Sequence, residues 1–529
     1  MTSKERSDAH EEVGRFIHDV YSSALRSNVD PALDLQELGG DSIAAMNIMF
    51  LIQERFPGTR NIPALRTIMG GMPSVEELTR EIESILAADT VTLEEELTGI
   101  DVAPRTLADQ EWFLQDAIPQ LARPQAWGVM TRIVAVPHDW TTAATVAAAH
   151  DLYTRHPALR ARFAVRGTQW HQYLLAADDM AVTLDRCVDE SDSHTLQRVV
   201  GEAEETLDIH DGPLASLVIV TDRSGHTPRY VVLTTHHLVC DLLSLQVIWA
   251  DLVHFQQLRA QSVGDGPKPD TTLAAYSTAL RAYAASEATR ARVDAWMGWD
   301  WTSLGLLPER AGTPDTERAV HRRRIPLSIK DVARKQGVDG GGHALLLAAT
   351  GYSLTALTGT PNVAKVVHHG RLAVPTGDLD ATRTVGRLAT SGIALFPKNS
   401  RTRTPRRYLS EFGGHNPPSA LSGPEYSIAR WLGPDTERLA ALETRSWPDQ
   451  VLINHVSDHS ALPGVLLPVD HPSEPNTTAP RFTALDVTIA TSPTEVHLTL
   501  SADPRKLDPD ALADFGATFG RFLAGLDNE

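Results

Sequence analysis

The stretch YVVLTTHHLVCDLLS, residues 230–244, decides the fold class of the larger part of the chain. Its first six residues are mostly apolar or β-branched and predict a strand, whereas the apolar run from Leu242 onward predicts a helix. An HHxxxD loop, His236 to Asp241, joins the two. Similar strand and helix patterns recur along the chain from Pro104, which predicts an α/β domain with this loop at a strand-to-helix junction.

The two histidines of the loop, His236 and His237, are expected to play different parts. Adjacent side chains of an extended segment point to opposite faces, so the pair is unlike a metal site. No HExxH or CxxC pattern elsewhere in the sequence supports zinc, and we expect no metal. One histidine should face a reaction site and the other should pack. Cys240 is also expected to pack, because free cysteines are commonly buried and inert.

The bulk composition predicts a folded protein of several compact units. The 529 residues are 42% hydrophobic and 22% charged, which leaves no compositional case for wholesale disorder. The net charge of -19 argues against nucleic acid or an anionic membrane as a partner, because both require a basic surface. Two cysteines form no disulfide framework, and the sequence shows no leader and no membrane-length apolar run. We therefore expect a soluble, cytoplasmic protein.

Residues 1–88 carry three apolar patterns at helical spacing. The first ends at Leu25, the second starts at Ser42 and the third covers residues 75–86, with polar or glycine-containing stretches between them. These patterns predict a small all-α unit, distinct from the α/β segment. The stretch 89–103, which has weak periodicity and three consecutive glutamates, is predicted to be a linker.

The second helical pattern of this unit begins within LGGDSI, residues 38–43. Asp41 and Ser42 alone would suit a helix N-cap, where side-chain oxygens accept backbone N–H groups. As a unit, however, LGGDSI resembles the phosphopantetheine attachment motif of peptidyl carrier proteins. The resemblance implies a four-helix carrier domain whose Ser42 carries 4'-phosphopantetheine, with an aminoacyl thioester on the terminal thiol. A helix N-terminus suits a phosphodiester, because its N–H groups and dipole favour negative charge.

The HHxxxD loop has companions that occur in a defined order along the chain. They are LADQEWFLQ (107–115), RHPALRARF (155–163), LDIHDGPL (207–214) and GGHALLLAA (341–349). Together with the loop they resemble the condensation superfamily of nonribosomal peptide synthetases. The resemblance implies two α/β lobes of chloramphenicol-acetyltransferase-like fold, arranged in a V with the active site in a tunnel between them. We expect the N-terminal lobe at 104–295 and the C-terminal lobe at 296–529.

The resemblance also implies roles for particular residues. His237, the second histidine, is expected to lie nearest the reacting thioester and to be catalytic. His236 and Asp241 would support the site. Asp241 would pair with Arg371 of the HHGRL stretch, because a buried carboxylate needs a cationic partner and removing either one would leave an unpaired charge.

Two features depart from the usual pattern of the superfamily. Leu242 stands where a glycine usually follows the aspartate, which narrows a channel-lining position. The C-terminal half contains stretches that look more like the epimerisation branch, and a carrier domain commonly precedes an epimerisation domain. These stretches are LDATRTVGRLATSGIALF (379–396), YSIARWL (426–432) and LINHVSD (452–458).

Epimerisation removes and returns an α-proton, which calls for two acid-base groups flanking one carbon. In this chain Val367 stands at the position of the branch's glutamate, and valine cannot move a proton. His455 replaces the tyrosine of the branch's NYLG motif. His368 and His369 could supply a substitute base, although histidines beside a strand are more often packing residues. We therefore favour amide formation over epimerisation.

The expected enzyme is an amide-forming transferase of peptide natural-product, and thus antibiotic, biosynthesis. An aminoacyl or peptidyl thioester on Ser42 would be attacked by an amine, with His237 orienting the amine and accepting or relaying its proton. A third possibility is a non-catalytic domain that recruits loaded carriers. The run Arg322–Arg324 is expected to be a solvated face.

The expected partners follow from the same resemblance. No nucleotide-binding signature is found, so a stand-alone adenylation enzyme is expected to load Ser42 in trans after a phosphopantetheinyl transferase has modified it. The amine acceptor would be free or attached to another carrier protein, and we favour the free amine. The donor amino acid and the product are left open by the sequence.

Overall fold

The structure is a computed structural model that describes most of the chain. The described residues are 3–25, 27–40, 42–56, 72–87, 105–121, 123–167, 169–186, 192–262, 267–305, 307, 318–338, 341–371, 379–398, 404–415, 425–447, 451–457, 465–469 and 482–528. The stretch predicted to be a linker and Cys187 lie outside these residues.

The described N-terminal residues form an all-α unit. Helices α1 (Ser3–Leu25), α2 (Ser42–Arg55) and α4 (Val75–Ala87) start or end close to the predicted bounds, although α1 begins earlier than its apolar pattern. Their apolar faces meet in one buried cluster, as amphipathic helices require. The described residues contain three helices of this unit, so the four helices expected of a carrier domain stay a prediction.

The N-terminal lobe is built on a five-stranded sheet in the order β11-β1-β6-β5-β4. The strands are β1 (Val129–Ala135), β4 (Val182–Arg186), β5 (Ala215–Thr221), β6 (Pro228–His236) and β11 (Leu467–Val469). One face packs against α6 (Thr142–Arg155) and α8 (Leu242–Ala260), and the other against α7 (Asp192–Glu205). The lobe also contains α5 (Ala108–Trp112), α9 (Thr272–Ala284) and the β2–β3 hairpin (Ala161–Arg166, Gln169–Leu174).

The C-terminal lobe contains a six-stranded mixed sheet in the order β7-β13-β12-β10-β8-β9. The strands are β7 (Ala319–Ile325), β8 (Asn362–His368), β9 (Thr390–Phe396), β10 (Val451–Ser457), β12 (Leu485–Thr491) and β13 (Val496–Ala502). One core joins the sheet to α11 (Ile329–Gln336), α12 (Gly341–Thr358), α13 (Pro405–His415) and α17 (Pro509–Asn528). A smaller core includes α10 (Glu287–Met297), α15 (Glu425–Leu432) and α16 (Thr436–Ser446).

The two lobes exchange segments across their junction. Strand β11 comes from the C-terminal half of the chain yet pairs with β1 of the N-terminal lobe. Ala381, Val385 and Leu388 are likewise buried in the core of the N-terminal lobe. Helix α10 spans the boundary expected at 295/296, and its apolar residues pack with the C-terminal lobe. The lobes are therefore interlocked and cannot be separated at a single position of the chain.

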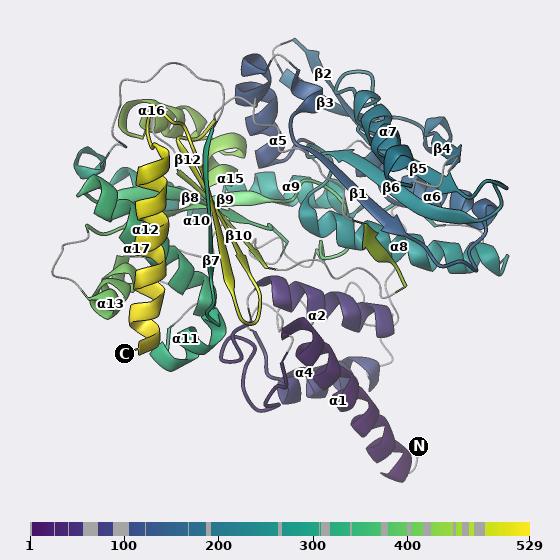
Figure 1. Ribbon diagram of the computed structural model, residues 1–529, viewed down its shortest axis with the longest axis horizontal. Coiled ribbons are helices and arrows are strands. Elements are labelled where there is room, and N and C mark those ends of the chain that lie inside the picture. Colours follow the sequence, from purple (N-terminus) through teal and green to yellow (C-terminus); the bar gives the residue numbers. More distant parts are fainter. Residues whose placement is uncertain are drawn as a thin grey trace.

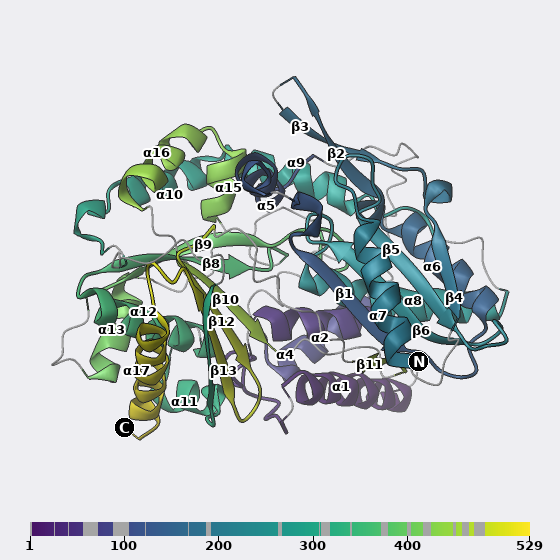
Figure 2. The same cartoon turned by 45° about the horizontal axis from the view of Figure 1, so that its top comes forward.

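The N-terminal helices lie beside the junction of the two lobes, with α2 nearest to it (Figure 1, Figure 2). Leu243, the second residue of α8, is 6% exposed and is buried in the core of the N-terminal unit. On the other lobe, Lys330 of α11 donates a hydrogen bond to the carbonyl of Leu25, with a distance of 3.1 Å. The N-terminal unit thus contacts both lobes. None of the helices among the described residues has the length and apolar character needed to cross a membrane.

Candidate active site at the lobe junction

The HHxxxD loop is positioned by the end of one element and the start of the next. Strand β6 ends at His236, and α8 begins at Leu242. Asp241 is the N-cap of α8, and its side chain accepts a 2.9 Å hydrogen bond from the backbone N–H of Ser244. N-cap aspartates stabilise helix starts in this way. The loop is therefore held rigidly at both ends, in a buried position.

His236 is a packing residue. Its side chain is fully buried, and its Nδ1 accepts a 3.0 Å hydrogen bond from the backbone N–H of Leu238. The proton of the neutral ring is therefore on Nε2, which donates to the carbonyl of Pro124 at 3.2 Å. Burial lowers the pKa of His236 to about 4. The ring is fixed in the neutral form with both nitrogens occupied.

His237 has the opposite arrangement. Its Nδ1 lies 2.7 Å from the carbonyl oxygen of Cys240, so Nδ1 carries the proton and donates it. Among the described residues no group hydrogen-bonds to Nε2, which is left as the basic nitrogen. Burial, followed by the positive charge of Arg387, lowers the pKa of His237 to about 3. The fixed tautomer leaves the Nε2 lone pair available, whereas the lowered pKa makes this nitrogen a weaker base than an ordinary histidine.

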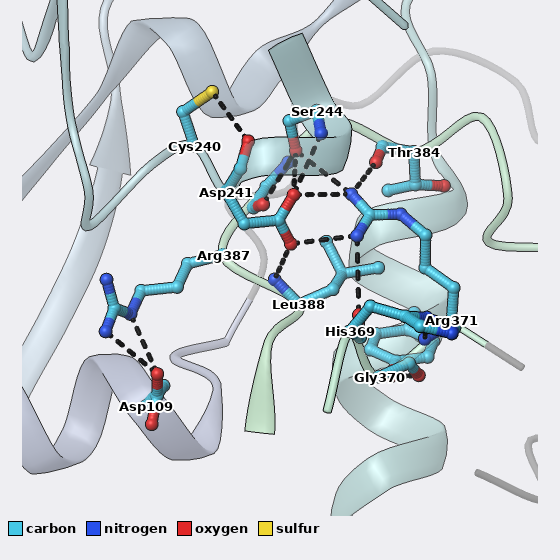
Figure 3. Close-up of polar contacts among 12 residues, drawn as sticks. Asp109, Cys240, Asp241, Ser244, His369, Gly370, Arg371, Thr384, Arg387 and Leu388 are labelled. Atoms are coloured by element: carbon cyan, nitrogen blue, oxygen red, sulfur yellow. Dashed lines mark hydrogen bonds and ion pairs between the residues drawn. The ribbon is translucent and has the colours of Figure 1, made fainter. Parts of the chain in front are cut away.

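Asp241 and Arg371 form the ion pair expected from the sequence, although they are far apart in the chain. Arg371 Nη1 donates to Asp241 Oδ2 at 2.8 Å and Nη2 donates to Oδ1 at 2.9 Å. Both side chains are buried, and Figure 3 shows the guanidinium facing the carboxylate. Burial alone would raise the pKa of Asp241, but the charge and hydrogen bonds of Arg371, with those of Ser244, hold it below its ordinary value. The pair closes the loop against the C-terminal lobe.

A further segment, residues 379–388, fastens the same loop and was not assigned this role from the sequence. The backbone N–H of Leu388 donates to Asp241 Oδ2 at 3.0 Å, and the N–H of Asp241 donates to the carbonyl of Gly386 at 3.2 Å. Arg387 donates to the carbonyl of His237 at 3.0 Å. It also donates to Asp109 at 2.8 Å, as Figure 3 shows. The stretch resembled the epimerisation branch in sequence, but nothing in its residue pattern indicated which loop it would contact.

Cys240 and Leu242 both pack. Cys240 is fully buried, burial raises the pKa of its thiol, and it is a packing residue as expected. Leu242 is half-buried and packs against the core of the N-terminal lobe. Arg322–Arg324 are exposed on β7, which is an edge strand, and thus form the solvated face that the sequence predicted.

The other histidines singled out by the sequence lie on the C-terminal lobe. His369 Nδ1 accepts a 3.1 Å hydrogen bond from the backbone N–H of Arg371, so His369 helps to hold that turn. His455 of β10 stacks on His343 of α12 with their Nδ1 atoms 3.2 Å apart. The ring of His368 lies 6.3 Å from that of His343, and burial, followed by the charge of His343, lowers the pKa of His368 to about 3. This histidine cluster was not predicted, because its members are separated in sequence.

A pocket beside the start of α2 contains the His343–His455 pair. It is a small cavity of about 80 Å³ that opens to solvent. Gly39, Gly40, Ala44 and Asn47, which flank Ser42 on both sides, line one wall, and the C-terminal lobe supplies the other with Lys330, His343, His455, Thr491 and Ser492. Ser42 is the first residue of α2, and its side chain lies outside the described residues. The lining is mostly polar and adjoins the start of α2, but the cavity is too small to enclose a whole phosphopantetheine arm, so only part of such an arm would contact it.

A second pocket opens on the N-terminal lobe, between α5, the β2–β3 hairpin and α9. Its lining includes Glu111, Trp170, Gln172, Arg281 and Trp431. Gln110 of α5 connects this region to the HHxxxD loop, because its amide donates a 2.7 Å hydrogen bond to the carbonyl of Leu238. Gln110 also lies 3.4 Å from Gln172 of the pocket lining, so this one residue lies between the pocket wall and the loop. A continuous tunnel between the two pockets stays a prediction.

The part of the chain that the structure describes contains no group of three or more histidine, cysteine, aspartate or glutamate side chains arranged to hold a metal ion.

Comparison with solved structures identifies the fold. The epimerization domain from the third module of tyrocidine synthetase B superposes with a TM-score of 0.64, covering 81% of this chain and 96% of that one at 15% identity. The condensation domain that mediates chain release from the enacyloxin polyketide synthase superposes with a TM-score of 0.58, covering 86% of this chain and 88% of that one at 17% identity. The X-domain from teicoplanin biosynthesis superposes with a TM-score of 0.57, covering 82% of this chain and 96% of that one at 16% identity. The two lobes thus have the fold of condensation-type domains.

Comparison of sequences narrows this class. Residues 134–395 match the family model of the condensation domain. A linear gramicidin synthase from Brevibacillus parabrevis is 26% identical over 422 residues, which is 77% of this chain and 8% of that protein. Nonribosomal peptide synthetase fmqA from Aspergillus fumigatus is 28% identical over 228 residues, 41% of this chain and 5% of that protein. This chain spans less than a tenth of the length of either relative.

Residues 134–395 thus resemble a condensation domain, and the proteins of similar sequence are nonribosomal peptide synthetases. The matches support the enzyme class expected from the sequence, an amide-bond-forming acyltransferase. The family match begins at residue 134 and does not include residues 1–88.

Proposed function

We propose that this protein forms an amide bond between an acyl group held as a thioester on the arm of Ser42 and an incoming amine, with His237 at the reacting centre. The observation that carries the proposal is the geometry of His237, whose Nδ1 proton is bound to the carbonyl of Cys240. This tautomer leaves the lone pair of Nε2 free to accept a hydrogen bond from the amine. The condensation-domain match around this loop supports the same reaction.

The proposed N-terminal carrier unit rests on LGGDSI, on the helix that starts at Ser42 and on the pocket beside that helix start. When bound, 4'-phosphopantetheine supplies a flexible thiol that holds the acyl group as a thioester. The residues of the pocket would bind and direct the arm toward the lobe junction. Covalent attachment raises the effective concentration of the acyl group to roughly millimolar or above.

In the proposed reaction the amine attacks the thioester carbonyl, a C–N bond forms and the C–S bond breaks. His237 Nε2 accepts a hydrogen bond from the amine, takes its proton as the C–N bond forms and passes it to the leaving sulfur. The Nδ1 hydrogen bond to Cys240 keeps Nε2 directed and stabilises the transient imidazolium. Asp241 and Arg371 contact each other and not the reacting atoms, so their role is to position the loop.

The partners of the proposed reaction are the ones inferred from the sequence. A phosphopantetheinyl transferase would modify Ser42, and a separate adenylation enzyme would load it. The acceptor amine, free or on another carrier, would enter through the pocket lined by Trp170 and Trp431, which adjoins the HHxxxD loop on the face formed by α5. The product would be an intermediate or end product of peptide natural-product biosynthesis.

Epimerisation is the second candidate, and the histidine cluster favours it. Val367 stands where the epimerisation branch has its acid-base glutamate, and His455 stands where it has the tyrosine of its NYLG motif. His455 is paired with His343, and His368 lies close by. Such a cluster could return a proton that His237 removes. Recruitment of loaded carriers without chemistry is the third candidate.

The deciding experiment is mass spectrometry of the arm in deuterated water, with and without candidate amines, on wild type, His237→Ala and Ser42→Ala. We expect modification by coenzyme A and a phosphopantetheinyl transferase in wild type and no mass gain in Ser42→Ala. We expect loss of the acyl group to an amine, slowed roughly 100-fold or more in His237→Ala, as for removal of a general base. One deuteron gained while the acyl group stays attached would replace condensation by epimerisation, and full turnover by His237→Ala would overturn the role of His237.

A further inference from the structure

Residues 379–388 contact the N-terminal helical unit at one end and the HHxxxD loop at the other. Asp380 and Thr382, at the first end, lie against α2. Gly386, Arg387 and Leu388, at the other end, bind the loop that carries His237 and Asp241, as described above. We call residues 379–388 the connecting segment. It brings into contact two parts of the protein that are about 200 residues apart in the sequence.

The contact with α2 is made through a buried amide. Gln53 is 1% exposed, and its Nε2 donates a 2.7 Å hydrogen bond to Asp380 Oδ2. Thr382 Oγ1 donates a 2.5 Å hydrogen bond to Asp380 Oδ1 and lies 3.3 Å from Gln53 Oε1, and the backbone N–H of Thr382 donates to the same Oδ1 at 2.9 Å. A buried amide N–H bound to a carboxylate favours one position of its partner, because a shift leaves buried polar groups unsatisfied.

The middle of the connecting segment is also held on both sides. Arg383 forms a 2.6 Å ion pair with Asp251 of α8. The carbonyl of Thr384 accepts a 2.9 Å hydrogen bond from Arg371 Nη2. The same guanidinium group also binds Asp241. A displacement of the segment at Gln53 would therefore disturb its contacts with α8 and with the buried ion pair of Asp241 and Arg371.

The N-terminal unit touches the other side of the loop as well. Leu243, in the first turn of α8 directly after Asp241, is buried in the core of that unit. The N-terminal unit thus reaches the loop that carries His237 by two routes. It contacts the first turn of α8 directly, and it contacts the connecting segment through Gln53.

We propose that Gln53 is a positioning residue: the seating of α2 on the connecting segment holds that segment, and through it the HHxxxD loop, in the arrangement required for reaction. The interaction surface formed by Asp380, Thr382 and Leu243 is then a docking site for the helix that starts at Ser42. Docking of the N-terminal unit and order at His237 are coupled, since the same residues take part in both. The proposal rests on the proposed function only for the identity of the reaction, because the coupling holds equally for condensation and epimerisation.

The test is hydrogen–deuterium exchange of the full-length protein, followed in peptides that cover 237–244 and 379–388. Gln53→Glu places a carboxylate against Asp380 in a buried position, and we expect both peptides to exchange roughly tenfold faster or more. Gln53→Glu/Asp380→Asn exchanges the donor and acceptor and should return both peptides to within about threefold of wild type. Arg55→Ala, on the exposed part of the same helix, is the matched control and should exchange like wild type in both peptides.

Faster exchange confined to α2, with both peptides unchanged, would overturn the coupling. So would a double variant as fast as Gln53→Glu, because the effect would then come from a destabilised helix and not from this contact. Gln53→Met keeps the side-chain size and replaces Gln53→Glu if the latter does not fold. Failure of the carrier assignment is recognised separately, as absence of Ser42 modification in wild type, and leaves the exchange result interpretable.

Discussion

Arg371 and Asp241 are the residues on which the geometry of the site depends most. Neither touches a reacting atom in the proposed mechanism, yet together they bind the HHxxxD loop, Ser244 and the connecting segment. Arg371 is fully buried, so the carboxylate is its necessary partner.

We predict that Asp241→Asn lowers the free energy of unfolding by roughly 3–5 kcal/mol, because it leaves the guanidinium of Arg371 buried without an anion. Urea unfolding measures the change. The control is Arg324→Gln, which removes an ion pair with Glu495 from an arginine that is 69% exposed and should change the free energy of unfolding far less, because solvent screens the pair. Equal costs for the two variants would contradict the central place given to the buried pair.

The buried histidines predict how stability depends on pH. The pKa values of about 3 for His237 and about 4 for His236 are below the ordinary value of about 6.5. Between these values the unfolded chain binds more protons than the folded one, so the free energy of unfolding decreases as the pH falls below about 6.5. The His237 resonances in ¹⁵N spectra, assigned with His237→Gln, should remain those of a neutral ring at pH 5. A midpoint near 6.5 for His237 would be incompatible with this burial.

At the scale of elements, the end of β8 must approach the connecting segment very closely. Gly370, in the turn after β8, has φ +75, and a Cβ placed on it would lie 1.9 Å from the carbonyl oxygen of Leu388. Its own carbonyl accepts a 2.6 Å hydrogen bond from Tyr276 of α9. Glycine is required here both for the left-handed backbone and for the contact.

We predict that Gly370→Ala destabilises the protein by at least about 2 kcal/mol more than Gly359→Ala. Gly359 also has a left-handed backbone, with φ +71, but a Cβ there meets nothing within 4 Å. The difference between the two variants therefore isolates the contact with Leu388 from the cost of the backbone conformation. Thermal and urea unfolding measure it, and similar values for the two variants would refute the need for close approach.

Most elements around the site could be predicted from residue patterns. Strand β6 and helix α8 end and begin within a residue or two of the predicted positions, because each has a clear apolar pattern. Strand β11 has only three residues and no such pattern, so its pairing with β1 could not be foreseen.

At the scale of the whole molecule, the N-terminal unit is seated at the junction of two interlocked lobes (Figure 2). This arrangement places the start of α2 beside the histidine cluster and the N-terminal unit against the first turn of α8, directly after the HHxxxD loop. The proposed function uses that proximity, because a short tethered path favours intramolecular reaction over a bimolecular encounter.

The sequence by itself determined the class of protein, the α/β fold around the HHxxxD loop, the helix that begins at Ser42 and, through resemblance to a family, the pairing of Arg371 with Asp241. These features depend on local patterns or on short motifs, which a single chain displays directly. Only the tertiary structure decided that His236 packs while His237 keeps Nε2 available, that His343 and His455 meet, and that the connecting segment joins Gln53 to the loop. Each of these depends on contacts between residues far apart in the chain, which no local pattern records.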